Sequence, residues 1–179
     1  MENKFVRYGV VLLIIAAACA GSLAVVNKFT KEVIAQNDLI VQNEARQKAM
    51  LNATGFKPDE TKKVSDGEGT LEFIPAYTGD QLIGYVTTVT AKGYGGDIVY
   101  MLGVSLDGKV TGLSVVSNSE TPGLGARVTE GPWQDHWKGV DVGYQFKKSV
   151  DAFAGATISP TAVYNGIIRA LTLFNKEVK

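Results

Sequence analysis

Residues 81–91 read QLIGYVTTVTA, and apolar or β-branched side chains recur at every second position in this stretch. Ile83, Tyr85, Thr87 and Val89 would therefore lie on one face of a β-strand. Three neighbouring segments have a similar character, namely LEFIPAY (71–77), VYMLGVSL (99–106) and KVTGLSVV (109–116). The middle of the chain thus predicts a β-sheet.

The turns between these segments predict how the strands are connected. Gly79 and Asp80 separate the first two segments, and Asp107 and Gly108 separate the last two. Such pairs of Gly and Asp favour the positive-φ turn of a β-hairpin. We therefore expect an antiparallel meander, which gives way after its fourth strand to the irregular stretch SETPGLGARV (119–128).

The C-terminal segment carries the signals of a helix. Ser159 is a good N-cap residue, and Pro160 suits the first helical position. Apolar residues then recur at helical spacing, at Val163, Ile167, Leu171 and Phe174. A sheet followed by a packed helix indicates an α+β fold.

The N-terminal segment is apolar enough to cross a membrane. No side chain from Tyr8 to Val26 carries a charge. A helix of that length spans about 28 Å, which is close to the hydrocarbon thickness of a bilayer. Basic residues flank both ends, so the charge rule gives only a slight preference for a cytoplasmic N-terminus.

Two other interpretations of this segment are open. The small residues from Ala16 to Gly21 also permit a cleaved signal peptide, or a lipoprotein anchor on Cys19. However, Leu23 to Val26 extend the apolar run beyond these small residues, where polar sequence normally follows a cleavage site. An uncleaved single-span anchor is therefore favoured, with Cys19 as a packing residue inside it.

Two segments connect the anchor to the folded part of the chain. Residues 30–51 lack Gly and Pro and mix apolar with charged side chains, which predicts an amphipathic helix. Residues 52–68 are rich in Lys, Asp, Gly, Thr and Ser and contain Pro58, which indicates a loop or linker. We therefore divide the chain into a tail and anchor (1–28), an amphipathic helix and linker (29–69) and a folded domain (70–179).

The composition argues against several classes of site. The chain has 179 residues, with 18 Lys and Arg against 18 Asp and Glu, so its formal net charge is zero and binding to nucleic acid is disfavoured. Cys19 and His136 are the only residues of their types. We therefore expect no disulfide framework, no iron–sulfur cluster and no metal site of the multi-cysteine or His-rich kind.

Thr157 directly precedes the predicted C-terminal helix. Free backbone N–H groups and the positive end of the helix dipole favour a phosphate group at such a position, and Gly155 lets a bulky ligand approach the backbone. A phosphate-bearing ligand is one interpretation of the stretch GATISP (155–160), and a simple helix cap is the other.

Two motifs resemble those of a known family. DAFAGATISPTAV (151–163) resembles the flavinylation motif of FMN-binding domains, Asp-x-x-Ser/Thr-Gly-Ala-Thr, in which the last threonine carries FMN through a phosphoester bond. SETPGLGARV resembles a segment found upstream of that motif in the RnfG component of Rnf electron-transport complexes and in the related NqrC component of sodium-translocating NADH:quinone reductase. The glycine-rich hairpin of residues 93–116, the short tail, the single span and the chain length are also similar to those of RnfG.

This resemblance implies a covalent FMN site. Thr157 would be esterified by a separate flavin transferase that uses FAD and a divalent metal, and Asp151 would be the motif residue needed for that step. Ala154 departs from the motif, because the family usually has Ser or Thr there. Ser159 and Thr161 carry competing hydroxyls, so only the motif register selects Thr157. The expected cofactor-binding residues are Glu120, Thr121, Gly123, Leu124, Gly125, Asp151, Gly155, Ala156, Thr157 and Ser159.

The resemblance also implies a function. The chain would be a membrane-anchored α+β flavoprotein that relays electrons within an Rnf-type complex, which couples electron transfer between ferredoxin and NAD to ion movement. Its FMN domain would lie on the extracytoplasmic side, beside integral subunits that carry a flavin and an iron–sulfur centre. Two other classes stay open: a non-redox module that binds a ligand or peptide on a membrane anchor, and a free-standing flavin reductase.

Four other residues have expected positions. Tyr94 of the GYGG stretch has two interpretations, a residue that borders the flavin or part of a simple glycine-rich loop between strands, and the simple loop is favoured. Trp133 and Trp137 are four residues apart, so they would share a helical face that packs on the core. His136, between them, is interpreted as a surface or capping residue.

Overall fold

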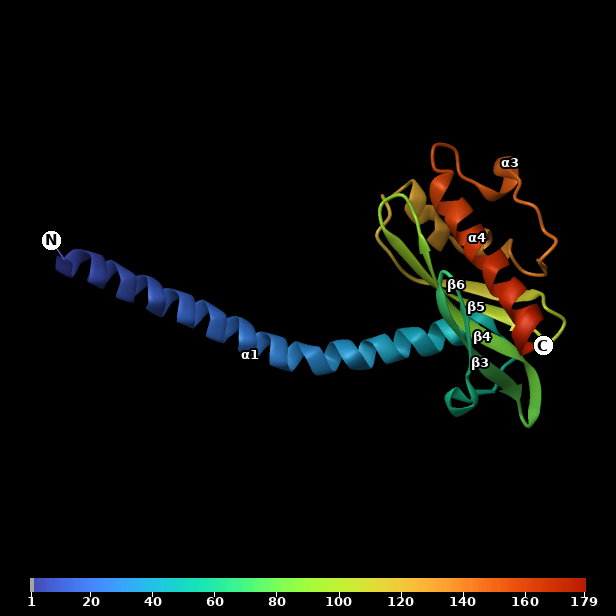
Figure 1. Ribbon diagram of the computed structural model, residues 1–179, viewed down its shortest axis with the longest axis horizontal. Helices are drawn as coiled ribbons and strands as arrows, with labels where there is room; N and C mark the ends of the chain where they lie inside the picture. Colours follow the sequence, from blue (N-terminus) through green and yellow to red (C-terminus); the bar gives the residue numbers. More distant parts are fainter. Residues whose placement is uncertain (1) are drawn as a thin grey trace. The chain divides into compact units, whose positions relative to one another are not determined.

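The computed structural model describes residues 2–179, which divide into two compact units with the boundary between Val41 and Gln42. A single helix, α1 (Glu2–Ala49), forms the first unit and continues into the second (Figure 1). Among the described residues, α1 is the one helix long and apolar enough to cross a membrane. The predicted span and the predicted amphipathic helix therefore belong to one continuous helix.

The second unit is built on a six-stranded antiparallel sheet with the strand order β1-β3-β4-β5-β6, in which β2 also pairs with β3. The strands are β1 (Gly55–Phe56), β2 (Lys62–Asp66), β3 (Gly69–Thr78), β4 (Gln81–Lys92), β5 (Asp97–Ser105) and β6 (Val110–Asn118). The predicted meander is confirmed, because β3, β4, β5 and β6 pair in chain order. Gly79 and Gly108 turn the two predicted hairpins, with φ values of 59° and 83°.

The segment predicted as a loop or linker, residues 52–68, instead contributes to the sheet. It forms β1, a short 3₁₀ helix η1 (Pro58–Glu60) and β2. Val64 of β2 pairs with Leu71 of β3, and both side chains are buried. The polar composition that indicated a linker belongs to an edge strand, whose outward side chains face water. The loop prediction was therefore wrong for most of this segment.

Helices cover one face of the sheet. In Figure 1, α4 (Ile158–Leu173) lies across this face, and a short π-helix, η3 (Phe174–Val178), follows it. The shorter helices are η2 (Gly125–Thr129), α2 (Gly131–Asp135) and α3 (Lys148–Asp151). The apolar residues predicted to line the C-terminal helix, Val163, Ile167, Leu171 and Phe174, are all fully buried. Because a mainly antiparallel sheet packs against these helices, the α+β class is confirmed.

The end of α1 covers the opposite face of the sheet. Ala45 and Ala49 pack there with Val86 and Met101, which alternate with the residues that face α4. Ile83 also packs against this cluster, so it does not share the face of Tyr85 as predicted. With both faces covered, the second unit has a core on each side of one sheet.

Candidate cofactor site

A pocket of about 330 Å³ lies at the N-terminal end of α4. Three segments that are far apart in the sequence line it: the glycine-rich loop between β4 and β5, the stretch after β6, and the loop before α4. The lining residues are Tyr94, Glu120, Thr121, Leu124, Gly125, Gly155, Ala156, Thr157, Ile158 and Ser159. The fold thus brings the two sequence motifs together around one cavity.

Glu120 joins the three segments. Its side chain is buried, with the whole residue only 8% exposed. The backbone N–H of Gly95 donates to Oε1 at 3.0 Å, and the hydroxyl of Ser159 donates to Oε2 at 2.7 Å. Buried carboxylates are stable when hydrogen bonds compensate for lost hydration, and both oxygens have such a bond here. Glu120 therefore holds the pocket walls together.

Glycines allow the backbone to approach this carboxylate closely. A Cβ atom at Gly125 would collide with Oε2 of Glu120 and with the hydroxyl of Ser159, and one at Gly93 would collide with Oε1 of Glu120. Gly123 has a different role, because it has a φ of 77° in the turn that precedes η2 and does not line the pocket. In the Pro-Gly-Leu-Gly stretch, Gly123 is therefore needed for its backbone conformation, and Gly125 is needed because no larger side chain fits beside Glu120.

The loop from Asp151 to Thr157 turns sharply before α4. The backbone N–H of Ala156 donates to the carbonyl of Phe153 at 3.0 Å, and Gly155 between them has a φ of 80°. The helix begins at Ile158 with Thr157 as its N-cap, which confirms that Thr157 directly precedes a helix. The prediction that Ser159 is the N-cap was wrong: Ser159 is the second helical residue, and its hydroxyl bonds Glu120 across the pocket.

The three hydroxyls near the helix start have different environments. Ser159 is buried and donates to Glu120, while Thr161 donates to the carbonyl of Thr157 at 2.8 Å. Within residues 2–179, the half-buried hydroxyl of Thr157 makes no hydrogen bond, and the backbone N–H groups of Ile158 and Ser159 find no acceptor. Thr157 therefore presents an uncommitted hydroxyl beside two free donors.

Asp151 is not part of the pocket wall. It is fully buried at the end of α3, where His136 Nε2 lies 2.7 Å from Oδ1, the hydroxyl of Tyr144 donates to Oδ1 at 2.8 Å, and the N–H of Lys147 donates to Oδ2 at 2.6 Å. Burial, together with the bond to Asp151, raises the pKa of Tyr144 to about 12, which favours the neutral hydroxyl that donates to the carboxylate over the phenolate.

His136 thus has a role that sequence reasoning missed. It lies just after α2 as its C-cap residue, in agreement with the capping interpretation, but its ring also contacts the motif carboxylate. Trp133 and Trp137 are buried with ring centroids 5.5 Å apart, so their predicted packing on the core is confirmed. No local signal in the sequence linked His136 with Asp151, because the contact joins residues 15 positions apart through an irregular segment.

Lys92 is a second residue that the sequence did not indicate. A further hollow of about 310 Å³ shares Thr157 and Ile158 with the pocket and is also lined by Lys92, Thr161 and Asn165. Lys92 is exposed at the end of β4 and forms no ion pair with the residues that the structure describes. A cation at this position suits an anionic group held at the start of α4.

The residues around the pocket fit FMN. The exposed side chains of Tyr94, Leu124 and Ile158 offer apolar surface for a flavin ring, and the hydroxyl and free N–H groups at the start of α4 suit a phosphate. Ala154 is exposed, so the missing hydroxyl of the motif leaves no buried polar group unpaired. Apart from Gly123 and Asp151, all predicted cofactor-binding residues line this pocket.

Comparison with protein families and solved structures supports this arrangement. Residues 93–172 match the FMN-binding domain family, and residues 1–53 match the RnfG N-terminal region. The fold is similar to that of a crystal structure of Shewanella oneidensis NqrC, with a TM-score of 0.51 and 22% identity over 72% of each chain. It is also similar to the C component of a Na⁺-translocating NADH-quinone reductase from Parabacteroides distasonis, with a TM-score of 0.52 and 16% identity over 79% of this chain and 94% of that one.

The sequence is also similar to that of curated relatives, and the similarity covers most of this chain. The G component of the Na⁺-translocating ferredoxin:NAD⁺ oxidoreductase complex of Acetobacterium woodii is 27% identical over 97% of this chain and 93% of its own. The G component of the proton-translocating complex of Clostridium ljungdahlii is 32% identical over 83% and 80%, and that of an ion-translocating oxidoreductase complex of Pseudomonas aeruginosa is 31% identical over 97% and 90%. The chain therefore belongs to the RnfG family of ion-translocating oxidoreductase complexes, as an electron-transfer subunit with an FMN-binding domain.

Proposed function

We propose that this chain carries FMN esterified through its phosphate to the hydroxyl of Thr157, and that this flavin relays electrons between other subunits of an Rnf-type complex. The observation that carries the proposal is the contrast among three neighbouring hydroxyls. Ser159 and Thr161 are both committed to hydrogen bonds, whereas Thr157 is half-buried at the pocket wall and makes no hydrogen bond through its hydroxyl within residues 2–179. The free hydroxyl of Thr157 thus supports the same attachment residue that the resemblance to the flavinylation motif indicates.

The attachment would use a partner enzyme, because the carboxylate of Glu120 in the pocket wall is already bonded to Gly95 and Ser159, and the hydroxyl of Thr157 has no hydrogen-bonded base within the described residues. A flavin transferase would deprotonate the hydroxyl, and Thr157 Oγ would then attack the FMN phosphorus of FAD. The phosphoanhydride bond breaks, AMP leaves, and the hydroxyl proton passes to the transferase. The product is a phosphodiester with one negative charge, which the N–H groups of Ile158 and Ser159 and the ammonium of Lys92 would stabilise.

Once bound, FMN would supply one- and two-electron redox chemistry, and the chain would supply its position. Leu124 and Ile158 offer apolar contact to the ring system, and Tyr94 is placed to stack on it at the pocket rim. Glu120 would act indirectly by holding the glycine-rich loop and α4 at a constant separation. The pocket is open to solvent beside exposed side chains, which suits electron exchange with a docked partner.

The membrane arrangement is part of the proposal. The apolar segment of α1 would anchor the chain with its N-terminus in the cytoplasm, in line with the slight charge preference of the flanking residues. The FMN domain would then lie on the extracytoplasmic side, near integral subunits that carry a flavin and an iron–sulfur centre. A covalent bond suits that location, since a flavin lost outside the cytoplasm is not readily replaced.

The proposal is tested by producing the chain together with a flavin transferase and measuring flavin fluorescence of the denatured protein. We expect fluorescence to remain with the wild-type chain and with Thr161→Val, and to vanish in Thr157→Val. These two variants remove the same hydroxyl from the same helix start, so they are matched controls. An unlabelled wild-type chain would instead favour a non-redox module that binds a ligand at these loops.

A further inference from the structure

We propose that His136 and Tyr144 are positioning residues for the esterification of Thr157, and that they act through the buried carboxylate of Asp151. The inference rests on the proposed covalent attachment. Neither residue belongs to the flavinylation motif, and neither lines the pocket. Among the described residues, the hydrogen bonds that both side chains make to the motif go to Asp151, which the motif contains.

While the domain is folded, the side chain of Asp151 cannot contact another protein. Its residue is 0% exposed, and both carboxylate oxygens already accept hydrogen bonds within the chain. A transferase that bound this side chain directly would have to unfold the segment around it. The role that the resemblance implies for Asp151 therefore has an intramolecular explanation: Asp151 would shape the loop that presents Thr157.

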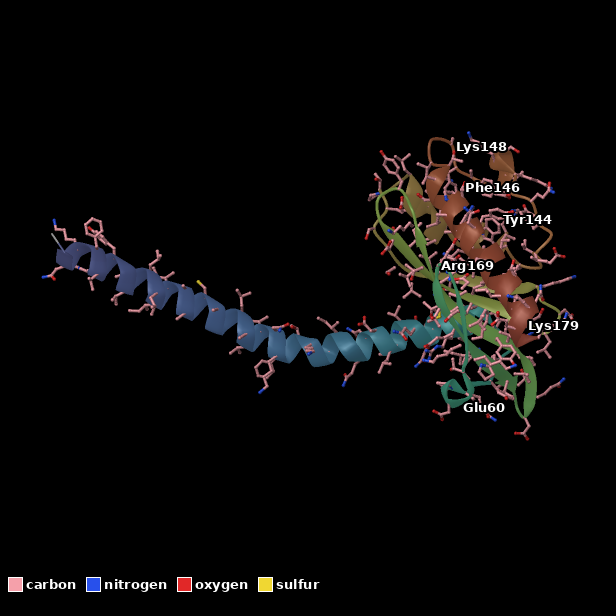
Figure 2. The ribbon with its side chains drawn as sticks, in the orientation of Figure 1. Glu60, Tyr144, Phe146, Lys148, Arg169 and Lys179 are labelled. Atoms are coloured by element: carbon pink, nitrogen blue, oxygen red, sulfur yellow. The ribbon has the colours of Figure 1, made fainter. Side chains whose placement is uncertain are left out.

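Asp151, the last residue of α3, connects α2 with the irregular segment between α2 and α3 through both its backbone and its side chain. The indole N–H of Trp133 donates to the carbonyl of Asp151 at 2.8 Å, and the N–H of Asp151 donates to the carbonyl of Lys147 at 2.8 Å. His136 and Tyr144 add the side-chain bonds from either side of residues 137–143. Figure 2 shows Tyr144 on the segment that leads to α3, beside α4.

Contacts of Phe153 connect the surroundings of Asp151 to the position of Thr157. Phe153 packs on Trp133 with ring centroids 5.5 Å apart, and the guanidinium of Arg127 lies 4.5 Å from the Phe153 ring centre. Phe153 then pairs with Ala156, the residue before Thr157. Loss of the bonds at Asp151 would loosen this loop and misplace the acceptor hydroxyl, and group transfer is sensitive to misplacement by about 1 Å.

The first test follows adduct formation on the full chain in detergent, with the transferase, FAD and Mg²⁺. We expect Tyr144→Phe and His136→Ala each to lower the maximal rate about tenfold, with the KM for FAD unchanged because FAD binds the transferase. His136→Gln should recover most of the rate, since its amide N–H can reach the carboxylate from the same side. A rate equal to that of the wild type in both Tyr144→Phe and His136→Ala would overturn the inference.

Tyr77→Phe is the matched control. The hydroxyl of Tyr77 donates to a carboxylate oxygen of Glu60 at 2.7 Å, so this variant removes the same kind of bond from the same domain. Figure 2 shows Glu60 at the opposite end of the domain from Tyr144. Tyr77→Phe should be modified at the wild-type rate, and an equal loss of rate in this control would also overturn the inference.

A second measurement does not depend on the transferase. Hydrogen exchange of the unmodified chain should become faster for the peptide that covers residues 152–157 in Tyr144→Phe, while exchange in the middle of α4 stays the same. Unchanged exchange in this loop would contradict the positioning role. If the wild-type chain formed no adduct while the loop responded as expected, the proposed attachment would fail together with the catalytic part of this inference.

Discussion

Ser159 and Thr161 illustrate how two hydroxyls of one helix can differ in what they stabilise. Ser159 donates to the buried carboxylate of Glu120, and Thr161 donates to a backbone carbonyl at the helix start. Sequence alone marked both as competitors of Thr157 for the flavin. Neither the burial of Glu120 nor its bond to Ser159 could be predicted, because the two residues lie 39 positions apart and meet only in the folded domain.

The first prediction at the residue scale concerns Ser159→Ala. This change leaves Oε2 of a buried carboxylate without its side-chain donor, and the loss of such a charged hydrogen bond costs about 1.5–3 kcal/mol of unfolding free energy. Urea denaturation of the variant measures the loss. Thr161→Ala, which removes a bond to a backbone carbonyl, should cost less than about 1 kcal/mol. Equal losses in the two variants would show that Glu120 does not depend on Ser159.

At the scale of elements, Arg169 ties the hairpin of β2 and β3 to α4. Its Nε donates to Oδ2 of Asp66 at 2.7 Å, and its Nη2 donates to the carbonyl of Gly69 at 3.1 Å. The guanidinium lowers the pKa of the Asp66 carboxyl from its ordinary value of 3.8 to about 2. The segment that the sequence presented as a linker is thus fastened to the helix that carries the cofactor site.

The pair of Arg169 and Asp66 predicts that the stability of the folded domain depends on pH. Because the pKa of Asp66 is lower in the folded state, its contribution to stability is present above about pH 4 and is lost as the pH falls toward 2. Asp66→Asn should therefore lower the melting temperature at pH 7, and the difference from the wild type should shrink between pH 4 and 2. Glu72→Gln, which breaks the exposed pair with Lys63 on the same hairpin, should change the melting temperature little. A constant difference at all pH values would contradict the assignment.

The elements that sequence reasoning predicted well were those with strong local signals. The two-residue periodicity and the Gly-Asp turns anticipated β3 to β6, and the helical spacing anticipated α4. The edge strand β2 was missed because one of its two faces is solvated and its composition is that of a loop. The spacing of Trp133 and Trp137 indicated a helix where α2 lies, but α3 and the irregular segment before it were missed, because their order comes from Tyr144 and Asp151, which meet through tertiary contacts.

At the scale of the whole molecule, the folded unit begins earlier than the sequence indicated. The structural boundary falls at Gln42, whereas composition suggested a domain from residue 70. The end of α1 explains the difference. Ala49 lies so close to the sheet that a Cβ atom at Gly103 or Gly112 would collide with the backbone of Ala49. The hydroxyl of Thr111 also donates to the carbonyl of Ala49 at 2.8 Å. This part of the helix is therefore one layer of the domain.

The prediction at this scale compares two shortened chains. A chain that begins at Gln42 retains both layers and should unfold cooperatively, as measured by circular dichroism. A chain that begins at Thr70 lacks β1, β2 and the residues that cover Val86 and Met101, so it would expose that apolar face and should not show a cooperative transition. Cooperative unfolding of the shorter chain would contradict the layered description.

The proposed electron relay depends on a phosphoester bond between Thr157 and FMN. Its most direct test is the mass spectrum of the tryptic peptide of residues 149–169 from the full chain matured with a flavin transferase, since this peptide also contains Ser159 and Thr161. We expect an added mass of one FMN less one water, with fragments that place it on Thr157. An unmodified peptide, or an adduct on Ser159 or Thr161, would show that Thr157 is not the attachment residue.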